Sequence, residues 1–175
     1  LDKGNQSNVS YESNTYEGYG PSGIAVICET LTDNRNRTVA DVRHYFDKYG
    51  AGLGNAGCVS WQFEQKGVLI IERGDLDEDE TMMTVLDAGA DDFQADEDCF
   101  QIYTAPEDFS AVRDALTEAG FEFAQAEIQM VPQNTITLES QEDMAQLRKL
   151  LDSLEDNDDV QHVWHNWENE DDYEE

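Results

Sequence analysis

Basic residues are scarce in this sequence. Lys and Arg together make up 10 of its 175 residues, whereas Asp and Glu make up 40, and the formal net charge is -30 at pH 7. A chain with this charge repels the phosphate backbone of a nucleic acid at long range. Tight binding to nucleic acid would therefore need a local basic patch or a second polypeptide. For most of the acidic side chains, solubility or adaptation to salt is the simpler explanation.

Cysteine is also scarce, and long apolar runs are missing. The three cysteines, Cys28, Cys58 and Cys99, stand apart among apolar neighbours, which argues against a disulfide framework and against a zinc site built on thiolates. No apolar run approaches the roughly twenty residues that cross a bilayer, and no charged-then-apolar leader opens the chain. We therefore expect a cytoplasmic protein that does not contact the membrane. Leu1 stands where an initiator Met would be, so the sequence leaves an upstream segment open.

The sequence contains no motif typical of an enzyme or of a bound cofactor. It shows no nucleophile elbow, no kinase signature and no Cys-His pair, and a hydrolase using carboxylates has no motif to support it. Asp75, Asp77 and Asp79 alternate as at the start of a calcium-binding loop, but Leu86 occupies the position of the bidentate Glu. The three histidines are too few and too far apart for a zinc site. We expect a non-enzymatic protein without a catalytic residue, a metal or a cofactor.

The first part of the chain predicts a strand followed by a helix. Residues 1–20 are polar and lack a clear period, so we interpret them as a linker or a frayed strand. A mostly apolar run predicts a strand over residues 24–31. Apolar side chains at helical spacing predict a helix over residues 38–49, and Gly50 follows as a stop signal.

Two further apolar runs predict a hairpin. Residues 58–63 and 68–71 flank a possible turn at residues 65–67, which end in glycine. Trp61 would then lie in a strand, where tryptophan is more often a core residue than a stacking surface. The segment His165-Asn166-Trp167, at the end of the last expected strand, is the more exposed aromatic candidate.

The middle of the chain predicts a compact domain over residues 67–133. Its expected elements alternate as β-α-β-β-α-β, which is the split pattern of ferredoxin-like folds. They are a strand at 68–72, a helix at 77–88 with Met82, Met83, Val85 and Leu86 as its apolar members, strands at 92–95 and 99–104, a helix at 106–119 and a strand at 126–131.

The last part of the chain predicts a second β-α-β unit. We expect a strand at 135–138, a helix that starts at Ser140, a strand at 160–164 and a disordered acidic tail from Glu168. This unit must cover its apolar faces, and the first β-α-β is the economical partner. The predicted fold class is therefore α+β with two domains. A ferredoxin-like domain, 67–133, is inserted into a discontinuous α+β domain formed by 1–66 and 134–175.

Arg35 and Arg37 lie close to the expected start of the first helix. Cations there oppose the positive end of the helix macrodipole. A bound anion would resolve the conflict, because free backbone N–H groups, guanidinium groups and Asn amides would form a phosphate-sized site. Alternatively, both arginines pair with local carboxylates such as Asp33, Glu29 or Asp41. The candidate nucleic-acid-binding residues are Asn34, Arg35, Asn36, Arg37, Arg43 and Lys48.

Several long motifs resemble the YebC/PmpR family. They are Tyr-Glu-Gly-Tyr-Gly-Pro-Ser-Gly at 16–23, Leu-Thr-Asp-Asn-Arg-Asn-Arg-Thr-Val at 31–39, Val-Ser-Trp at 59–61 with Phe63, and Leu-Glu-Asp-Asn-Asp-Asp-Val-Gln at 154–161 with His165-Asn166. The resemblance implies a YebC-like architecture of three domains, in which a ferredoxin-like third domain is inserted into the second. It also implies a lysine-rich helical first domain, and this chain begins after the point where that domain would end.

The resemblance implies a regulator of gene expression. Family members are commonly described as DNA-binding transcriptional regulators. A mitochondrial relative is a translational activator of cytochrome c oxidase subunit I, and bacterial relatives have been linked to ribosomes stalled on proline-rich stretches. We therefore expect a monomeric DNA-binding transcriptional regulator or, alternatively, a ribosome-associated translation factor. Its partner would be DNA or ribosomal RNA, bound with help from the first domain, and basic ribosomal or transcription proteins could dock on the acidic inserted domain.

Overall fold

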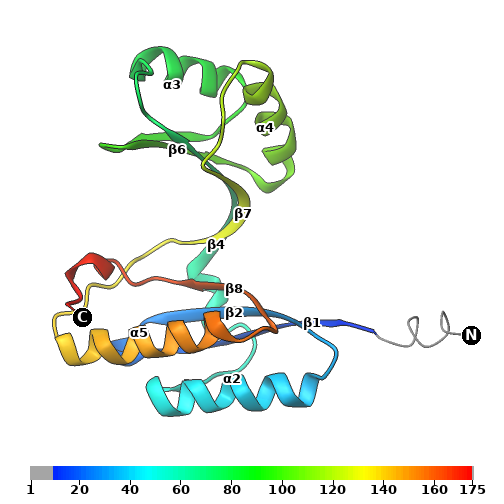
Figure 1. Ribbon diagram of the computed structural model, residues 1–175, viewed down its shortest axis with the longest axis vertical. Coiled ribbons are helices and arrows are strands. Elements are labelled where there is room, and N and C mark those ends of the chain that lie inside the picture. Colours follow the sequence, from blue (N-terminus) through cyan, green and yellow to red (C-terminus); the bar gives the residue numbers. More distant parts are fainter. Residues whose placement is uncertain (1–9, 175) are drawn as a thin grey trace, which may run out of the picture. The chain divides into compact units, whose positions relative to one another are not determined.

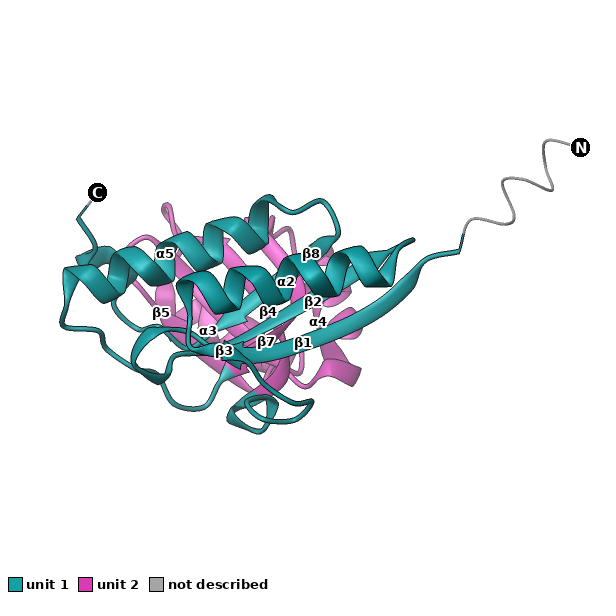
Figure 2. Cartoon of the chain, turned by 90° about the horizontal axis from the view of Figure 1, so that it is seen from below, with its two compact units in different colours: residues 1–63, 132–175 teal, residues 64–131 magenta. Residues whose placement is uncertain are grey.

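The computed structural model describes residues 10–174, and within it the chain forms two compact units. Unit 1 comprises residues 1–63 and 132–175, and unit 2 comprises residues 64–131 (Figure 2). Unit 2 is thus one continuous segment that interrupts unit 1. Both units combine antiparallel strand pairs with helices, so the α+β class predicted from the sequence is confirmed.

Unit 1 is a four-stranded sheet with two helices on one face (Figures 1 and 2). The strand order is β3-β1-β2-β8, and every neighbouring pair is antiparallel. The elements are β1 (Glu12–Tyr19), β2 (Ala25–Thr32), α2 (Arg35–Tyr49), β3 (Gly52–Leu53), α5 (Gln141–Asp156) and β8 (Val160–His165). The described part of the expected linker or frayed strand is therefore a regular strand with partners on both sides.

The core of unit 1 lies between the sheet and the two helices. α2 contributes Val42 and Phe46, which are fully buried at a spacing of one helical turn. α5 contributes five buried apolar side chains at helical spacing, namely Met144, Leu147, Leu150, Leu151 and Leu154. Fully burying such a side chain stabilises a fold by about 1.5–3 kcal/mol. The Ser140 hydroxyl accepts a hydrogen bond from Asp143 N at 3.2 Å, so the predicted cap starts α5.

The C-terminal segment differs from the prediction at two places. Residues 135–138 form only an isolated bridge between Ile136 and Trp167 instead of a strand. The tail is not disordered in its described part, which ends at residue 174, because Trp167 is buried and Tyr173 packs against the core. The Asn169 side chain ties this tail to residue 138. It accepts a hydrogen bond from Leu138 N and donates one to Leu138 O. The buried Trp167 and the partly buried Tyr173 thus hold an acidic segment whose composition predicts disorder.

Unit 2 has the element order expected from the sequence (Figure 1). Its sheet has the strand order β5-β6-β4-β7, and its core brings together Leu69, Ile102, Val112 and Leu116. The elements are β4 (Phe63–Glu72), α3 (Glu78–Asp87), β5 (Asp92–Ala95), β6 (Cys99–Thr104), α4 (Phe109–Glu118) and β7 (Gln125–Pro132).

The hairpin predicted around residues 65–67 is wrong. Residues 63–72 form the single strand β4, and residues 60–62 form a 3-10 turn before it. Gly67 is not a turn glycine, because it pairs with Thr104 of β6 in the middle of the sheet. A Cβ at this position would collide with the side chains of Thr104 and Phe109. The glycine is therefore explained by the close approach of α4 to the strand, and not by backbone conformation.

We predict that Gly67→Ala destabilises unit 2. The added methyl must displace the Phe109 ring, and overpacking of this kind costs about 1–3 kcal/mol. Urea unfolding monitored by circular dichroism measures the loss. Gln65→Ala, at an exposed position of the same strand, is the matched control. Equal stability of the two variants would contradict the packing argument.

Candidate nucleic-acid interface

The start of α2 is built by Asn34, and the helix begins at Arg35, three residues before the predicted start. The Asn34 side chain accepts a hydrogen bond from Arg37 N at 3.1 Å. Asn34 N in turn donates to the Thr32 hydroxyl at 3.0 Å, and the Thr38 hydroxyl donates to Asn34 O at 3.2 Å. This is a regular N-cap, in which a side chain satisfies a free N–H group of the first turn. The Asn34 amide oxygen is thus already in use within the protein.

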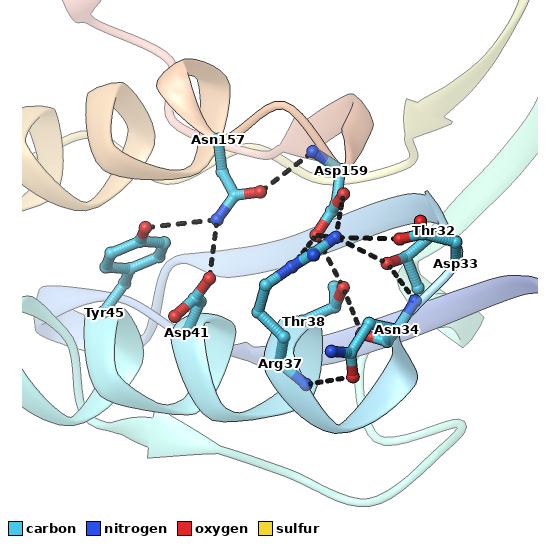
Figure 3. A network of polar contacts seen from close by, with 9 residues as sticks. All are labelled: Thr32, Asp33, Asn34, Arg37, Thr38, Asp41, Tyr45, Asn157 and Asp159. Atoms are coloured by element: carbon cyan, nitrogen blue, oxygen red, sulfur yellow. Dashed lines mark hydrogen bonds and ion pairs between the residues drawn. The ribbon is translucent and has the colours of Figure 1, made fainter.

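The Arg37 guanidinium is held by carboxylates (Figure 3). Its Nε and Nη2 atoms donate to Asp159 at 3.2 and 3.0 Å, and Nη2 also donates to Asp33 at 3.2 Å. Of the two alternatives left open by the sequence, pairing with carboxylates is what the structure shows for Arg37. Asp33 was among the expected partners, but Asp159 lies 122 positions away along the chain and could not be predicted from local sequence.

Asp159 joins two segments of unit 1, the turn between α5 and β8 and the helix α2. Besides Arg37, it accepts a hydrogen bond from the Thr38 hydroxyl at 2.8 Å. Its own N–H donates to the Asn157 side chain, which donates in turn to Asp41 and Tyr45 of α2 (Figure 3). Partial burial raises the pKa of Asp159, but the Thr38 hydroxyl and the Arg37 guanidinium outweigh that effect, so the pKa lies below its usual value. The carboxylate therefore stays ionised and fastens the α5–β8 turn to α2.

The space beside Arg37 does not suit a phosphate. A pocket of about 440 Å³ lies there, and its lining includes Asp41, Asp156, Asp158 and Asp159. Several carboxylates against one neutralised guanidinium repel an anion. The predicted phosphate-sized site at this helix terminus is therefore absent from the geometry, although nucleic-acid binding by the six candidate residues stays a prediction.

The other candidate cations point into solvent. Arg35 Nε lies 3.7 Å from a Glu12 carboxylate oxygen, and both side chains are more than half exposed, so this ion pair is weak. Arg43 is exposed on α2, as is Asn36, and the Lys48 amine lies 5.2 Å from the Tyr49 ring centroid. Within residues 10–174, neither Arg43 nor Lys48 forms an ion pair. At 100° per residue these cations are spread around the helix and do not form one stripe.

Glu17 is a structural centre that the sequence analysis missed. Its side chain is buried in β1 and accepts hydrogen bonds from the backbone N–H groups of Gly57, Val59 and Ser60 at 2.6, 3.1 and 2.7 Å. Burial raises the pKa of Glu17, but the three hydrogen bonds lower it by more than burial raises it. The pKa of Glu17 therefore lies below its usual value. Glu17 lies within the 16–23 motif, and no local pattern of the sequence shows that its carboxylate binds backbone N–H groups about forty positions away.

The loop that Glu17 holds places Trp61 at the surface. The Trp61 side chain is 69% exposed, and its Nε1 donates to Cys58 O at 3.0 Å. The interpretation of Trp61 as a core residue is therefore wrong. Asn166 and Trp167, expected to be the more exposed candidates, are both buried. The segment before β4 turns outward because it is a 3-10 turn and not a strand.

Residues 10–174 contain no cluster of three or more His, Cys, Asp or Glu side chains suited to a metal ion. In the same range, no helix is both long and apolar enough to cross a membrane. The Cys28 thiol is buried in the core of unit 1, and burial followed by the nearby Glu29 raises its pKa to about 12. This thiol is protonated and unreactive at neutral pH.

Comparison with known proteins defines the class of this fold. Residues 11–167 match a family described as "TACO1/YebC second and third domain". Because this match covers most of the chain, the chain belongs to that family, as the resemblance implied.

Two curated relatives and one solved structure show how close the similarity is. A "Probable transcriptional regulatory protein" of Acetivibrio thermocellus is 55% identical over 154 residues, which are 87% of this chain and 64% of the relative. A protein of the same description from Ruminiclostridium cellulolyticum is 53% identical, over 87% of this chain and 62% of its own length. The crystal structure of a conserved hypothetical protein from Aquifex aeolicus matches with a TM-score of 0.80 and 40% identity, over 90% of this chain and 65% of that chain. This chain thus spans slightly less than two thirds of each relative.

We predict that acid destabilises the wild-type protein more than the Asp159→Asn variant. A carboxyl whose pKa is lowered by folding adds stability above its unfolded pKa, and this contribution is lost as the pH falls through the folded pKa. At neutral pH the variant should be less stable by about 1 kcal/mol, the usual contribution of a lost hydrogen bond. Urea unfolding at intervals from neutral to acidic pH measures both effects. Parallel curves for the two proteins would show that Asp159 is not linked to folding.

We also predict that Glu17→Gln loosens the loop at residues 54–62. Glutamine must turn its amide NH2 toward either Gly57 N or the Val59 and Ser60 N–H groups, so at least one donor loses its acceptor. Hydrogen exchange at these three amides should become at least about tenfold faster, as a loss of about 1.4 kcal/mol requires. Glu12→Gln, at an exposed position of the same strand, is the control. Unchanged protection of the loop amides would show that the buried carboxylate does not hold them.

Proposed function

We propose that the protein is a non-enzymatic regulator of gene expression. The observation that carries this proposal is the family match over residues 11–167, together with relatives more than half identical that bear the description "Probable transcriptional regulatory protein". The chain spans only about 62–64% of those two relatives, so the activity of the complete protein is part of the proposal.

We further propose that unit 2 is a ferredoxin-like domain inserted into a discontinuous domain, unit 1. The β-α-β-β-α-β element order and the strand order β5-β6-β4-β7 support this assignment. The continuous course of unit 2 between two segments of unit 1 supports the insertion. In this architecture each unit has its own core and can carry a separate interaction.

The exposed surface of α2 is the proposed contact with DNA. Arg43 and Lys48 are exposed on α2 and form no ion pair within residues 10–174, and because they lie on different sides of the helix, each would contact a phosphate separately. Each neutralised phosphate lowers the logarithm of the binding constant by about 0.9 per tenfold rise in salt concentration. Two such contacts therefore give weak binding that depends on salt. Such binding fits a cytoplasmic protein that uses a further element to reach high affinity. The same surface would serve ribosomal RNA if the alternative function, in translation, is correct.

The double variant Arg43→Glu/Lys48→Glu tests this surface. We expect affinity for a fluorescent DNA duplex at low salt to fall at least about tenfold, with a reduced salt slope, as measured by anisotropy. The control is Lys66→Glu/Arg113→Glu in unit 2, which changes the net charge by the same amount. An equal loss of DNA affinity in the two double variants would mean that only net charge matters. The α2 surface would then be excluded as the DNA contact.

Sedimentation with 70S ribosomes separates the two nucleic-acid partners. If the α2 double variant loses ribosome association while duplex binding is unaffected, the translational alternative replaces DNA binding. Loss of duplex binding with intact ribosome association supports the DNA-binding proposal.

A further inference from the structure

Helix α3 presents apolar side chains to solvent. Met82, Met83 and Leu86 are 36%, 64% and 45% exposed, whereas Thr81 and Val85 of the same helix are buried. A surface helix normally turns its largest apolar side chains toward the core. Leu86 follows Met82 by four positions and Met83 by three, so the three side chains are neighbours on one surface. We call this surface the α3 apolar face.

Carboxylates surround the α3 apolar face. Glu78, Asp79 and Glu80 occupy the first turn of α3 behind the capping Asp77, and Asp87 ends the helix. Asp79 lies three and four positions before Met82 and Met83, and Asp87 lies four after Met83, which places both next to the apolar side chains. In residues 10–174, none of Asp79, Glu80 and Asp87 takes part in an ion pair. Their charges are therefore available to a partner.

An open groove with apolar and charged walls adjoins the start of α3. Leu76, which precedes the capping residue, is 39% exposed and lines a pocket of about 580 Å³. The lining includes the apolar side chains Ile71, Phe121 and Phe123, the carboxylates Glu72, Asp75 and Glu122, and the Arg73 guanidinium, which is paired with Glu78. A pocket of this size accommodates one or two large side chains of a binding partner.

The charge of both units restricts what can cover this surface. Unit 2 carries 19 acidic and 3 basic residues, and unit 1 is also net acidic, with 21 against 7. Nucleic acid, a second copy of this chain and unit 1 itself would all bring negative charge against negative charge. A positively charged partner gains from the same field. The apolar centre requires that this partner also bring an apolar stripe.

We infer that the α3 apolar face docks a basic amphipathic helix of a partner protein. Leu or aromatic side chains of that helix pack on Met82, Met83 and Leu86, and flanking Lys or Arg side chains pair with Asp79, Glu80 and Asp87. Flexible methionine side chains adapt well to such a helix, as surfaces that bind amphipathic helices commonly show. The inference concerns unit 2 alone, so it holds whether or not α2 binds nucleic acid.

A synthetic amphipathic helix made of Leu and Lys is the probe. We expect it to bind the complete 175-residue chain with an affinity that falls as salt rises, measured by isothermal titration calorimetry. Amide chemical shifts in NMR spectra should move chiefly within residues 76–87 and 120–124. A peptide with the same Leu positions and Glu in place of Lys should not bind, because the surrounding carboxylates repel it.

Two variants separate the apolar and the charged contributions. Met83→Ser/Leu86→Ser should weaken binding of the Leu/Lys peptide at least about tenfold, the lower range for removing a buried contact at an interface. Asp79→Asn/Glu80→Gln/Asp87→Asn should make the affinity for the Leu/Lys peptide less dependent on the salt concentration. Ile128→Ser, a change at another exposed apolar position of unit 2, should leave the affinity unchanged.

Several outcomes would overturn the inference. Shift changes centred outside residues 76–87 and 120–124, equal binding of the Glu peptide, or equal weakening by Ile128→Ser would each mean that the peptide binds nonspecifically or elsewhere. A dimer in light scattering that Met83→Ser/Leu86→Ser dissolves would assign the face to a second copy of the chain. The shift map uses the wild-type protein, so it decides even if a variant folds poorly.

Discussion

The bond network of Asp159 ties the two chain segments of unit 1 to each other. This one carboxylate, at the entry to β8, binds the guanidinium of Arg37 and the hydroxyl of Thr38, both in the first turn of α2. It thereby links segments more than 120 positions apart, which the β2–β8 ladder and the common core also hold together. The arginine at a helix start, unfavourable by itself, is stabilised because an acidic side chain takes the place of the anion that the helix terminus attracts. What suggested a binding site is thus an internal fastening of the fold.

Much of the fold could be predicted from local patterns, and the errors have identifiable physical causes. The strands at 92–95 and 99–104 agree in every residue, and the cap at Ser140 starts α5, because alternation and capping are local signals. Gly67 was misinterpreted because a glycine required by the close approach of α4 looks the same in sequence as a turn glycine. The candidate site was less predictable. Asp159, Glu17 and the exposed Trp61 owe their roles to tertiary partners, which no local pattern contains.

The chain separates its interaction chemistry between two units of different character. Unit 1 carries most of the basic residues, and those of α2 are exposed to solvent. Unit 2 has very few cations and combines carboxylates with exposed methionine and leucine side chains on α3. Electrostatics alone would direct a basic protein segment to unit 2, whereas the net negative charge of both units repels a polyanion at long range, so that binding of a polyanion would depend on the local cations of α2.

The point where the chain leaves and re-enters unit 1 has a consequence for engineering and for evolution. Gln133 N donates a hydrogen bond to Gln62 O at 2.8 Å, so the two chain segments of unit 1 that precede and follow unit 2 are adjacent at this point. A linker of a few glycines could span that gap in place of the whole intervening segment. Such a change, made by design or in evolution, would leave all four strands of the β3-β1-β2-β8 sheet in place, because they all belong to unit 1.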